Sequence, residues 1–144
     1  MYGIIIHMRV GLYYNKNYIS DNLIYLEKIS TEFQSRKIRC VTVDSINDLD
    51  GLDLLMVLGG DGTILMIASE CAKRGIKIIG INYGHLGFLA EFEPDKLDKA
   101  IELICSGNFC TEKRSMLKIE YSDKVFYALN DLVIQRSTSG NAFS

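Results

Sequence analysis

The chain has 144 residues, a formal net charge of −2 and 48% hydrophobic residues. A chain of this length forms one domain, or one domain and a fragment, and is long enough to bury a core. Its ordinary apolar content and nearly balanced charge argue against disorder and against a nucleic-acid partner. Residues 3–6 predict a first strand, and the polar residues 7–19 predict a loop.

A helix is predicted next, from an N-cap at Ser20 or Asp21 to about Arg36, because apolar residues recur there with helical spacing. These apolar residues are Leu23, Ile24, Leu26, Ile29 and Phe33. Residues 38–43 are β-branched or apolar at most positions and predict a second strand. Residues 44–52 form an acidic connection to the next element.

Residues 53–63 are the stretch around which the rest of the chain is organised. Leu54–Leu58 is a continuous apolar run, which is typical of a buried strand in a parallel sheet. Three glycines follow, and Asp61 is the only residue between them that carries a side chain. From Thr63 to about residue 74 the spacing of apolar residues becomes helical, and Gly75 is the expected C′ residue.

This arrangement places Asp61 where the carboxyl end of a strand meets the amino end of a helix. Ligands of open α/β sheets bind at that edge, and a helix amino end attracts phosphate. The alternative is that Asp61 is only an N-cap in a common type of turn. The spacing excludes a P-loop, because no Gly-Lys-Ser/Thr follows, and excludes G-x-G-x-x-G, because Leu65 occupies the place of its third glycine.

A second unusual stretch, Asn82–Leu89, follows a predicted strand at residues 77–81. Because neighbouring parallel strands end at the same edge, this stretch and Asp61 are expected to line one crevice. Asn82 can hydrogen-bond a ligand there, and Phe88 can stack on a flat ring. The alternative is that Phe88 and His85 only cover the sheet.

Pro94 stands just inside the start of the last predicted helix, which ends near Gly107. The alternation of strands and helices predicts an α/β fold, a parallel Rossmann-like sheet with helices on both faces. After residue 110 the chain predicts consecutive strands at 117–121, 124–129 and 132–134, which indicates an antiparallel sheet. We therefore predict an α/β nucleotide-binding domain at residues 1–110 and the first, incomplete part of a β-rich domain at 111–144. We also expect the chain to be truncated, with an exposed sheet edge that favours self-association.

Four cysteines and two histidines are too few and too widely spaced to predict a metal site held by the protein. Cys40 and Cys71 fall on apolar faces, as buried reduced thiols do. No signal peptide is evident, and no apolar run approaches the roughly 20 residues that span a bilayer. We therefore expect a cytoplasmic protein without a membrane partner.

Three stretches together resemble the NAD kinase family: Gly59–Thr63, Asn82–Leu89 and Ala128–Asp131. The first is shared with lipid kinases of the diacylglycerol and sphingosine type and, in part, with phosphofructokinases. The second, at this distance from the first, is far more restrictive. The resemblance covers nearly the whole chain, but only about the amino-terminal half of a usual family member. Residue 131 is Asp where many members have Glu, and both occur in the family.

The resemblance implies phosphoryl transfer from ATP, or from polyphosphate in some members, to the 2′-hydroxyl of the adenosine ribose of NAD. It implies that Asp61 accepts the ribose hydroxyl proton and stays ionised beside a helix amino end. Main-chain N–H groups of Gly60, Gly62 and Thr63 would face phosphate oxygens, and Mg²⁺ on the ATP phosphates would neutralise charge. The remaining implied contacts to NAD involve Asn82, Phe88, Asn130 and Asp131.

Two other functions are considered for this sequence. One is a lipid kinase, which would carry an Asn-Glu soon after the glycine-rich turn, whereas residues 64–67 here are apolar. The other is a non-catalytic nucleotide-binding module. Asn130 and Asp131, read from spacing alone, also fit a strand bulge or corner. We expect the 144-residue chain alone to have little or no kinase activity and the full-length protein to be a homo-oligomer.

Overall fold

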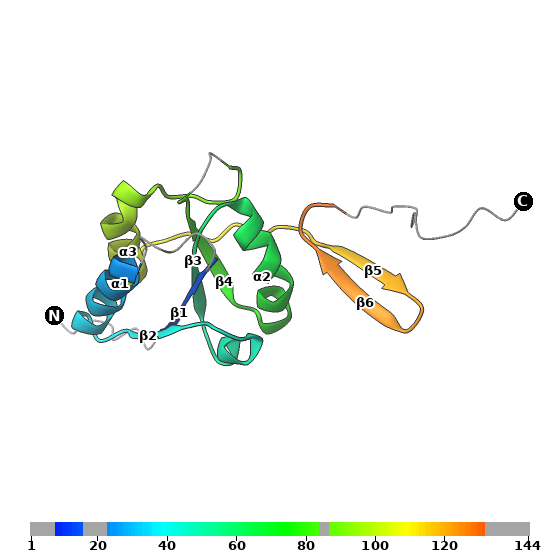
Figure 1. Cartoon of the computed structure of the whole chain (residues 1–144), viewed down its shortest axis with the longest axis horizontal. Helices are drawn as coiled ribbons and strands as arrows, with labels where there is room; N and C mark the ends of the chain where they lie inside the picture. Colours follow the sequence, from blue (N-terminus) through cyan, green and yellow to red (C-terminus); the bar gives the residue numbers. More distant parts are fainter. Residues whose placement is uncertain (1–7, 16–22, 84–86, 132–144) are drawn as a thin grey trace, which may run out of the picture.

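The computed structural model describes residues 8–15, 23–83 and 87–131. Four parallel strands form the main sheet in the order β2-β1-β3-β4, and a separate antiparallel hairpin follows (Figure 1). The strands of the main sheet are β1 (Arg9–Tyr14), β2 (Arg39–Thr42), β3 (Leu54–Leu58) and β4 (Lys77–Ile81). The helices are α1 (Leu23–Ser35), α2 (Asp61–Arg74) and α3 (Leu97–Ser106). Short 3₁₀ helices occur at Ile46–Leu49 and Pro94–Lys96.

The first strand of the sheet is not where the sequence suggested. β1 occupies Arg9–Tyr14, inside the segment 7–19 that was expected to be a loop, while the expected strand at residues 3–6 lies outside the described residues. β1 pairs with both β2 and β3, so it is central. The loop prediction was wrong because tyrosines are common in strands, and here Tyr13 and Tyr14 pack against the two apolar clusters described next.

The side chains of β3 are buried on both faces of the sheet. All five of its residues are buried, and they alternate between two apolar clusters on opposite faces of the sheet. Leu54, Met56 and Leu58 face the first cluster, whereas Leu55 and Val57 face the second. The continuous apolar run is therefore the pattern of a strand that exposes neither face.

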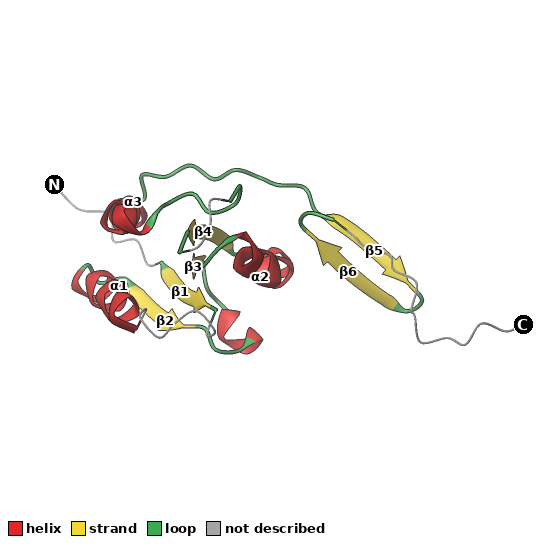
Figure 2. Ribbon diagram, turned by 45° about the horizontal axis from the view of Figure 1, so that its top comes forward, coloured by secondary structure: helices red, strands yellow, loops and turns green. Residues whose placement is uncertain are grey.

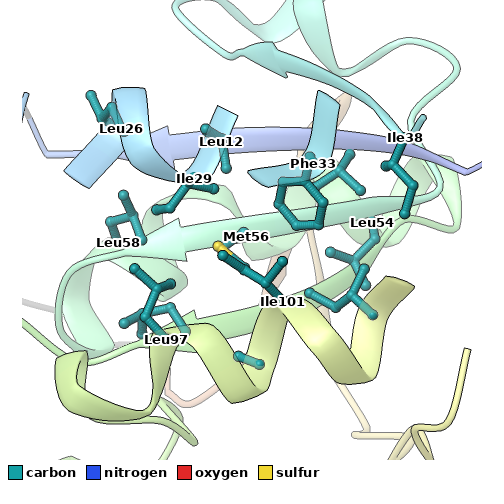
Figure 3. Close-up of a cluster of buried hydrophobic side chains, with 14 residues drawn as sticks. Leu12, Leu26, Ile29, Phe33, Ile38, Leu54, Met56, Leu58, Leu97 and Ile101 are labelled. Atoms are coloured by element: carbon teal, nitrogen blue, oxygen red, sulfur yellow. The ribbon is translucent and has the colours of Figure 1, made fainter. Parts of the chain in front are cut away.

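Helices α1 and α3 cover the first face, and α2 with the 3₁₀ helix Ile46–Leu49 covers the second (Figure 2). Side chains of α1, the strands and α3 interdigitate between the layers (Figure 3). Phe33 is fully buried at the centre of this packing. Ile24, which was grouped with the inward-facing residues of α1, is instead 77% exposed, because its position lies off the stripe of Leu26, Ile29 and Phe33.

Glycines lie next to the ends of helices α2 and α3. Gly75 ends α2 and Gly107 ends α3, each with a left-handed backbone (φ 69° and 68°) that glycine adopts without strain. Helix α2 begins at Asp61, two residues before the predicted start, with Gly60 as its N-cap in an extended conformation. The first turn of α2 therefore contains Asp61 and Gly62.

The strands β5 (Leu117–Tyr121) and β6 (Lys124–Ala128) form the predicted antiparallel hairpin, which lies beyond α2 (Figures 1 and 2). Its register places Ile119 opposite Phe126 on one face. Most hairpin side chains are exposed, including Tyr121 and Phe126. The third strand predicted at residues 132–134 and the segment after it lie outside the described residues, and the domain boundary at residue 110 stays a prediction.

Cys40 and Cys71 behave as structural thiols. Cys71 is buried and Cys40 packs against the first apolar cluster. Burial raises the pKa of each of these thiols to about 11, so neither is a thiolate near neutral pH. All four cysteines are unpaired thiols in the structure. Among the described residues, no helix is long and apolar enough to span a membrane.

Candidate functional site at the carboxyl edge of the sheet

The glycine-rich turn connects β3 to α2 at the carboxyl edge of the sheet. The N–H of Gly59 donates to the carbonyl of Ile81 at 3.0 Å, which ties the end of β3 to the end of β4. A side chain at Gly59 would collide with Thr63, since a Cβ there would lie 2.4 Å from the Thr63 hydroxyl oxygen. Gly59 is therefore required by packing.

Gly60 and Gly62 are different from Gly59. A Cβ at either position would meet no heavy atom within 4 Å, and neither glycine has a positive φ. Gly62 also lies inside α2, where glycine costs about 1 kcal/mol relative to alanine. The described part of the chain gives no internal reason for these glycines, whereas a ligand that approaches the main chain closely would.

The Asp61 side chain points across the edge to the loop after β4. The N–H of Phe88 donates to Oδ2 at 2.7 Å, and the N–H groups of Leu89 and Ala90 donate to Oδ1 at 3.0 and 3.3 Å. These hydrogen bonds join the first two sequence motifs in space. The contacts place both motifs at the same edge of the sheet, whereas a crevice lined by both of them stays a prediction.

The amide of Phe88, with smaller contributions from those of Leu89 and Ala90, lowers the pKa of Asp61 below its ordinary value, against an opposing effect of partial burial. The direction agrees with the expected ionised state. The main physical cause differs, because the sequence analysis attributed it to the amino end of the helix. The loop amides are the donors instead.

Gly80 lets the loop reach this position. A Cβ at Gly80 would lie 2.8 Å from the Cα of Ala90, so only glycine allows the chain to pass so close to β4. The carbonyl of Gly80 accepts hydrogen bonds from Glu91 and Phe92, and the N–H of Asn82 donates to the carbonyl of Phe92 at 2.7 Å. The returning segment thus runs along the edge of β4.

The predicted site residues differ in their accessibility. Asn82 is buried beside this segment, whereas the Phe88 side chain is 94% exposed and free to stack on a ligand. Thr63 is buried, and its N–H donates to the carbonyl of Gly60 at 3.0 Å. This N–H was expected to face phosphate, but it is already used within the first turn of α2. The remaining amides at this helix start, which have no intrahelical acceptor, belong to Gly60, Asp61 and Gly62.

A cavity of about 570 Å³ borders the same loop. It lies between α2, residues 88–91 and the linker 110–114, and Leu129 contributes to its wall. Its volume is within the range of roughly 300–1,000 Å³ that is usual for small-molecule sites. Asn130 and Asp131, both exposed, follow directly after Leu129. The third motif thus begins at the cavity wall, although no contact joins Asn130 or Asp131 to Asp61 in the described part of the chain.

The sequence analysis did not identify the importance of Gly80. Gly80 interrupts an otherwise apolar strand, which is a known signal for close backbone approach. A Cβ at Gly87 would lie 2.3 Å from Oδ1 of Asp61. Gly84, His85 and Leu86, in the middle of the second motif, lie outside the described residues.

The described residues contain no group of three or more His, Cys, Asp or Glu side chains that could hold a metal ion. In the described part of the chain, the edge instead presents main-chain N–H groups and the Asp61 carboxylate. Such a donor set fits Mg²⁺ only when phosphates of a bound nucleotide supply most of its ligands.

The fold and this edge define the class of protein. It is an α/β protein with a parallel sheet. Its glycine-rich turn and acidic residue lie at the carboxyl end of β3 and contact the loop after the adjacent strand β4, at the edge where such folds bind ligands.

Comparison with known proteins identifies the family. The sequence profile of the ATP-NAD kinase N-terminal domain matches residues 14–109, so the chain belongs to the NAD kinase family. The chain is 36% identical over 114 residues to an NAD kinase of Caldicellulosiruptor saccharolyticus, covering 78% of this chain and 44% of the relative. It is 51% identical over 94 residues to an NAD kinase of Clostridium botulinum, covering 62% of this chain and 32% of the relative. The chain thus spans less than half the length of these relatives.

Two solved structures share the fold. An NAD kinase from Archaeoglobus fulgidus in complex with ATP superposes with a TM-score of 0.58 at 21% identity, covering 77% of this chain and 41% of that one. Yeast NADH kinase complexed with NADH superposes with a TM-score of 0.65 at 19% identity, covering 84% and 43%. The predicted fold class is confirmed.

Proposed function

We propose that this chain is part of an NAD kinase that transfers a phosphoryl group from ATP to the 2′-hydroxyl of the adenosine ribose of NAD. One observation carries the proposal beyond family membership: Asp61 is flanked by Gly60 and Gly62, which nothing inside the described chain requires. Because neither neighbour of Asp61 has a side chain, a sugar hydroxyl and a phosphate group can both come close to the carboxylate and the main chain here.

In this proposal Asp61 accepts a hydrogen bond from the ribose hydroxyl and takes its proton late in the reaction. A carboxylate with a lowered pKa is too weak a base to ionise a sugar hydroxyl in the ground state. Its main contribution is therefore to orient the hydroxyl toward the phosphoryl group in a loose transition state.

The other predicted residues act on binding. The amides of Gly60, Asp61 and Gly62 bind phosphate oxygens, and Phe88 stacks on the adenine or borders the ribose. The side chains that hold polar groups of NAD are those of Asn82, Asn130 and Asp131. Thr63 supports the turn through its buried side chain. Mg²⁺, bound by the nucleotide phosphates, supplies charge neutralisation when present.

The cellular setting is part of the same proposal. The four free thiols suit a reducing cytoplasm. The sequence charge gives no support for a nucleic-acid partner. The full-length protein is proposed to be a homo-oligomer, as the family resemblance implies.

The kinase activity is tested with the chain and with the chain fused to the carboxyl-terminal part of the Caldicellulosiruptor saccharolyticus relative. Calorimetric titration with NAD and ATP measures binding, and a coupled assay with ATP and Mg²⁺ measures NADP. We expect NADP from the fusion and little or none from the chain alone. A fusion that folds but phosphorylates diacylglycerol, or neither substrate, contradicts the proposal, and robust NADP formation by the chain alone contradicts its dependence on the remaining segment.

Gly62→Ala separates a structural role of this glycine from a role in binding. Because alanine fits the space and favours the helix, the free energy of unfolding is expected to rise by about 0.4–1 kcal/mol. Nucleotide affinity is expected to fall, because the new methyl group occupies the path of the ligand. Urea unfolding and calorimetric titration measure the two effects. Gly59→Ala is the matched comparison, and it is expected to lower stability because of its collision with Thr63.

A more stable Gly62→Ala variant that binds nucleotide as well as the unsubstituted chain would show that no ligand approaches here.

A further inference from the structure

The Asp61 carboxylate accepts hydrogen bonds from three amides of the loop. A carboxylate offers about four lone-pair positions to hydrogen-bond donors. Two positions on Oδ1 are taken by the amides of Leu89 and Ala90, and one on Oδ2 is taken by the amide of Phe88. Among the donors of the described residues, one position therefore remains unused, and it is on Oδ2.

Gly87 determines whether this arrangement can form. The three heavy atoms nearest to a Cβ at Gly87 are Oδ1, Cγ and Oδ2 of Asp61, at 2.3, 2.5 and 2.6 Å. The obstacle to a side chain at position 87 is therefore the Asp61 carboxylate, the mobile end of a side chain, which would have to leave the amides.

We propose that Gly87 is a positioning residue for Asp61: its missing side chain lets the amides of Phe88–Ala90 hold the carboxylate with one Oδ2 lone pair left for the substrate hydroxyl. This inference rests on the proposed function for the identity of the hydroxyl, but the contact itself does not. It names Oδ2 as the atom that receives the proton. As the substrate oxygen bonds to the γ-phosphorus of ATP, the bond from that phosphorus to the bridging oxygen breaks and its electron pair leaves with ADP. The hydroxyl proton moves from the substrate oxygen to Oδ2.

The contact affects the position and the basicity of the Asp61 carboxylate in opposite ways. The amides make the carboxylate a weaker base, since they stabilise its ionised form. A carboxylate pushed away by a new methyl group would be a stronger base but would point elsewhere. If orientation is what the reaction needs, catalysis falls although basicity rises.

The first test is a ¹³C NMR titration of the aspartate carboxyl groups in the 144-residue chain, with the Asp61 signal assigned from its loss in Asp61→Asn. We expect a pKa below the ordinary range in the unsubstituted chain and a higher value in Gly87→Ala. Leu89→Ala is the matched control, because it changes a side chain of the same loop and keeps every amide. An unchanged Asp61 titration in Gly87→Ala would overturn the inference, whatever the kinase assay shows.

Stability against pH provides a second readout. The folded pKa of Asp61 lies below its unfolded value, so its contribution is fully present above the unfolded pKa and is lost as pH falls through the folded pKa. The difference in stability between the unsubstituted chain and Gly87→Ala should therefore shrink on acidification. If Gly87→Ala does not fold, the double variant Asp61→Ala/Gly87→Ala should recover stability. Failure to recover would contradict the inference.

The kinetic test uses the NADP-forming fusion. Gly87→Ala is expected to lower kcat on the order of a hundredfold with little change in KM, as for a misplaced catalytic group. In the Asp61→Asn background the same substitution should add little further loss, because groups that act as a unit are non-additive. Full additivity would show that Gly87 acts independently of Asp61. If the Asp61 pKa rises in Gly87→Ala but no fusion forms NADP, the contact between Gly87 and Asp61 is supported and the proposed function is contradicted.

Discussion

Asp61→Asn is expected to lower the rate of NADP formation on the order of a hundredfold to ten-thousandfold, the usual cost of losing a positioned base. The structure gives a second reason for a large loss. An asparagine side chain has one carbonyl oxygen and an NH₂ group, which cannot accept from an N–H. The loop amides at Phe88–Ala90 would therefore lose at least one acceptor.

The measurement is initial-rate kinetics on the NADP-forming fusion, together with hydrogen exchange of the loop amides. Asp53→Asn is a matched control, because Asp53 precedes β3 and also accepts a main-chain hydrogen bond, from the N–H of Arg9 at 2.7 Å. It lies at the opposite end of the strand from Asp61. If Asp61→Asn turns over as fast as Asp53→Asn, Asp61 is not the base.

Phe33→Ala is expected to lower the free energy of unfolding by about 3–5 kcal/mol, as is typical when a buried aromatic ring is removed. Phe33 is 0% exposed and packs in the cluster between α1, the sheet and α3 (Figure 3). The loss combines the transfer free energy of the ring with the cavity left behind. Urea unfolding of the chain provides the measurement.

Phe88→Ala is the comparison for Phe33→Ala, since the same side chain is removed from a position that is 94% exposed. Its unfolding midpoint should be close to that of the unsubstituted chain, because little apolar surface returns to water. Ligand binding should weaken if Phe88 stacks on the nucleotide. Equal losses of stability in the two variants would mean that the packing described for α1 is wrong.

Local patterns in the sequence predicted much of the fold. The run Leu54–Leu58 predicted a strand buried on both faces, and Gly75 and Gly107 predicted helix ends, because these features depend on residues close in sequence. The segment Arg9–Tyr14 was mispredicted, since its neighbours in the sheet are β2 and β3, far along the chain. Ile24 was misplaced because apolar character alone does not show which face of a helix meets the sheet.

The sequence by itself determined the α/β class, the glycine-rich turn with Asp61 at the end of β3, and the family resemblance, since each depends on short motifs and their spacing. The tertiary structure alone decided which atoms Asp61 meets. The return of the chain past Gly80 brings the amides of Phe88–Ala90 to the carboxylate, and this contact spans 27 to 29 positions in the sequence. Only packing between the ends of β3 and β4 fixes such a distance, because backbone amides carry no sequence signal of their own.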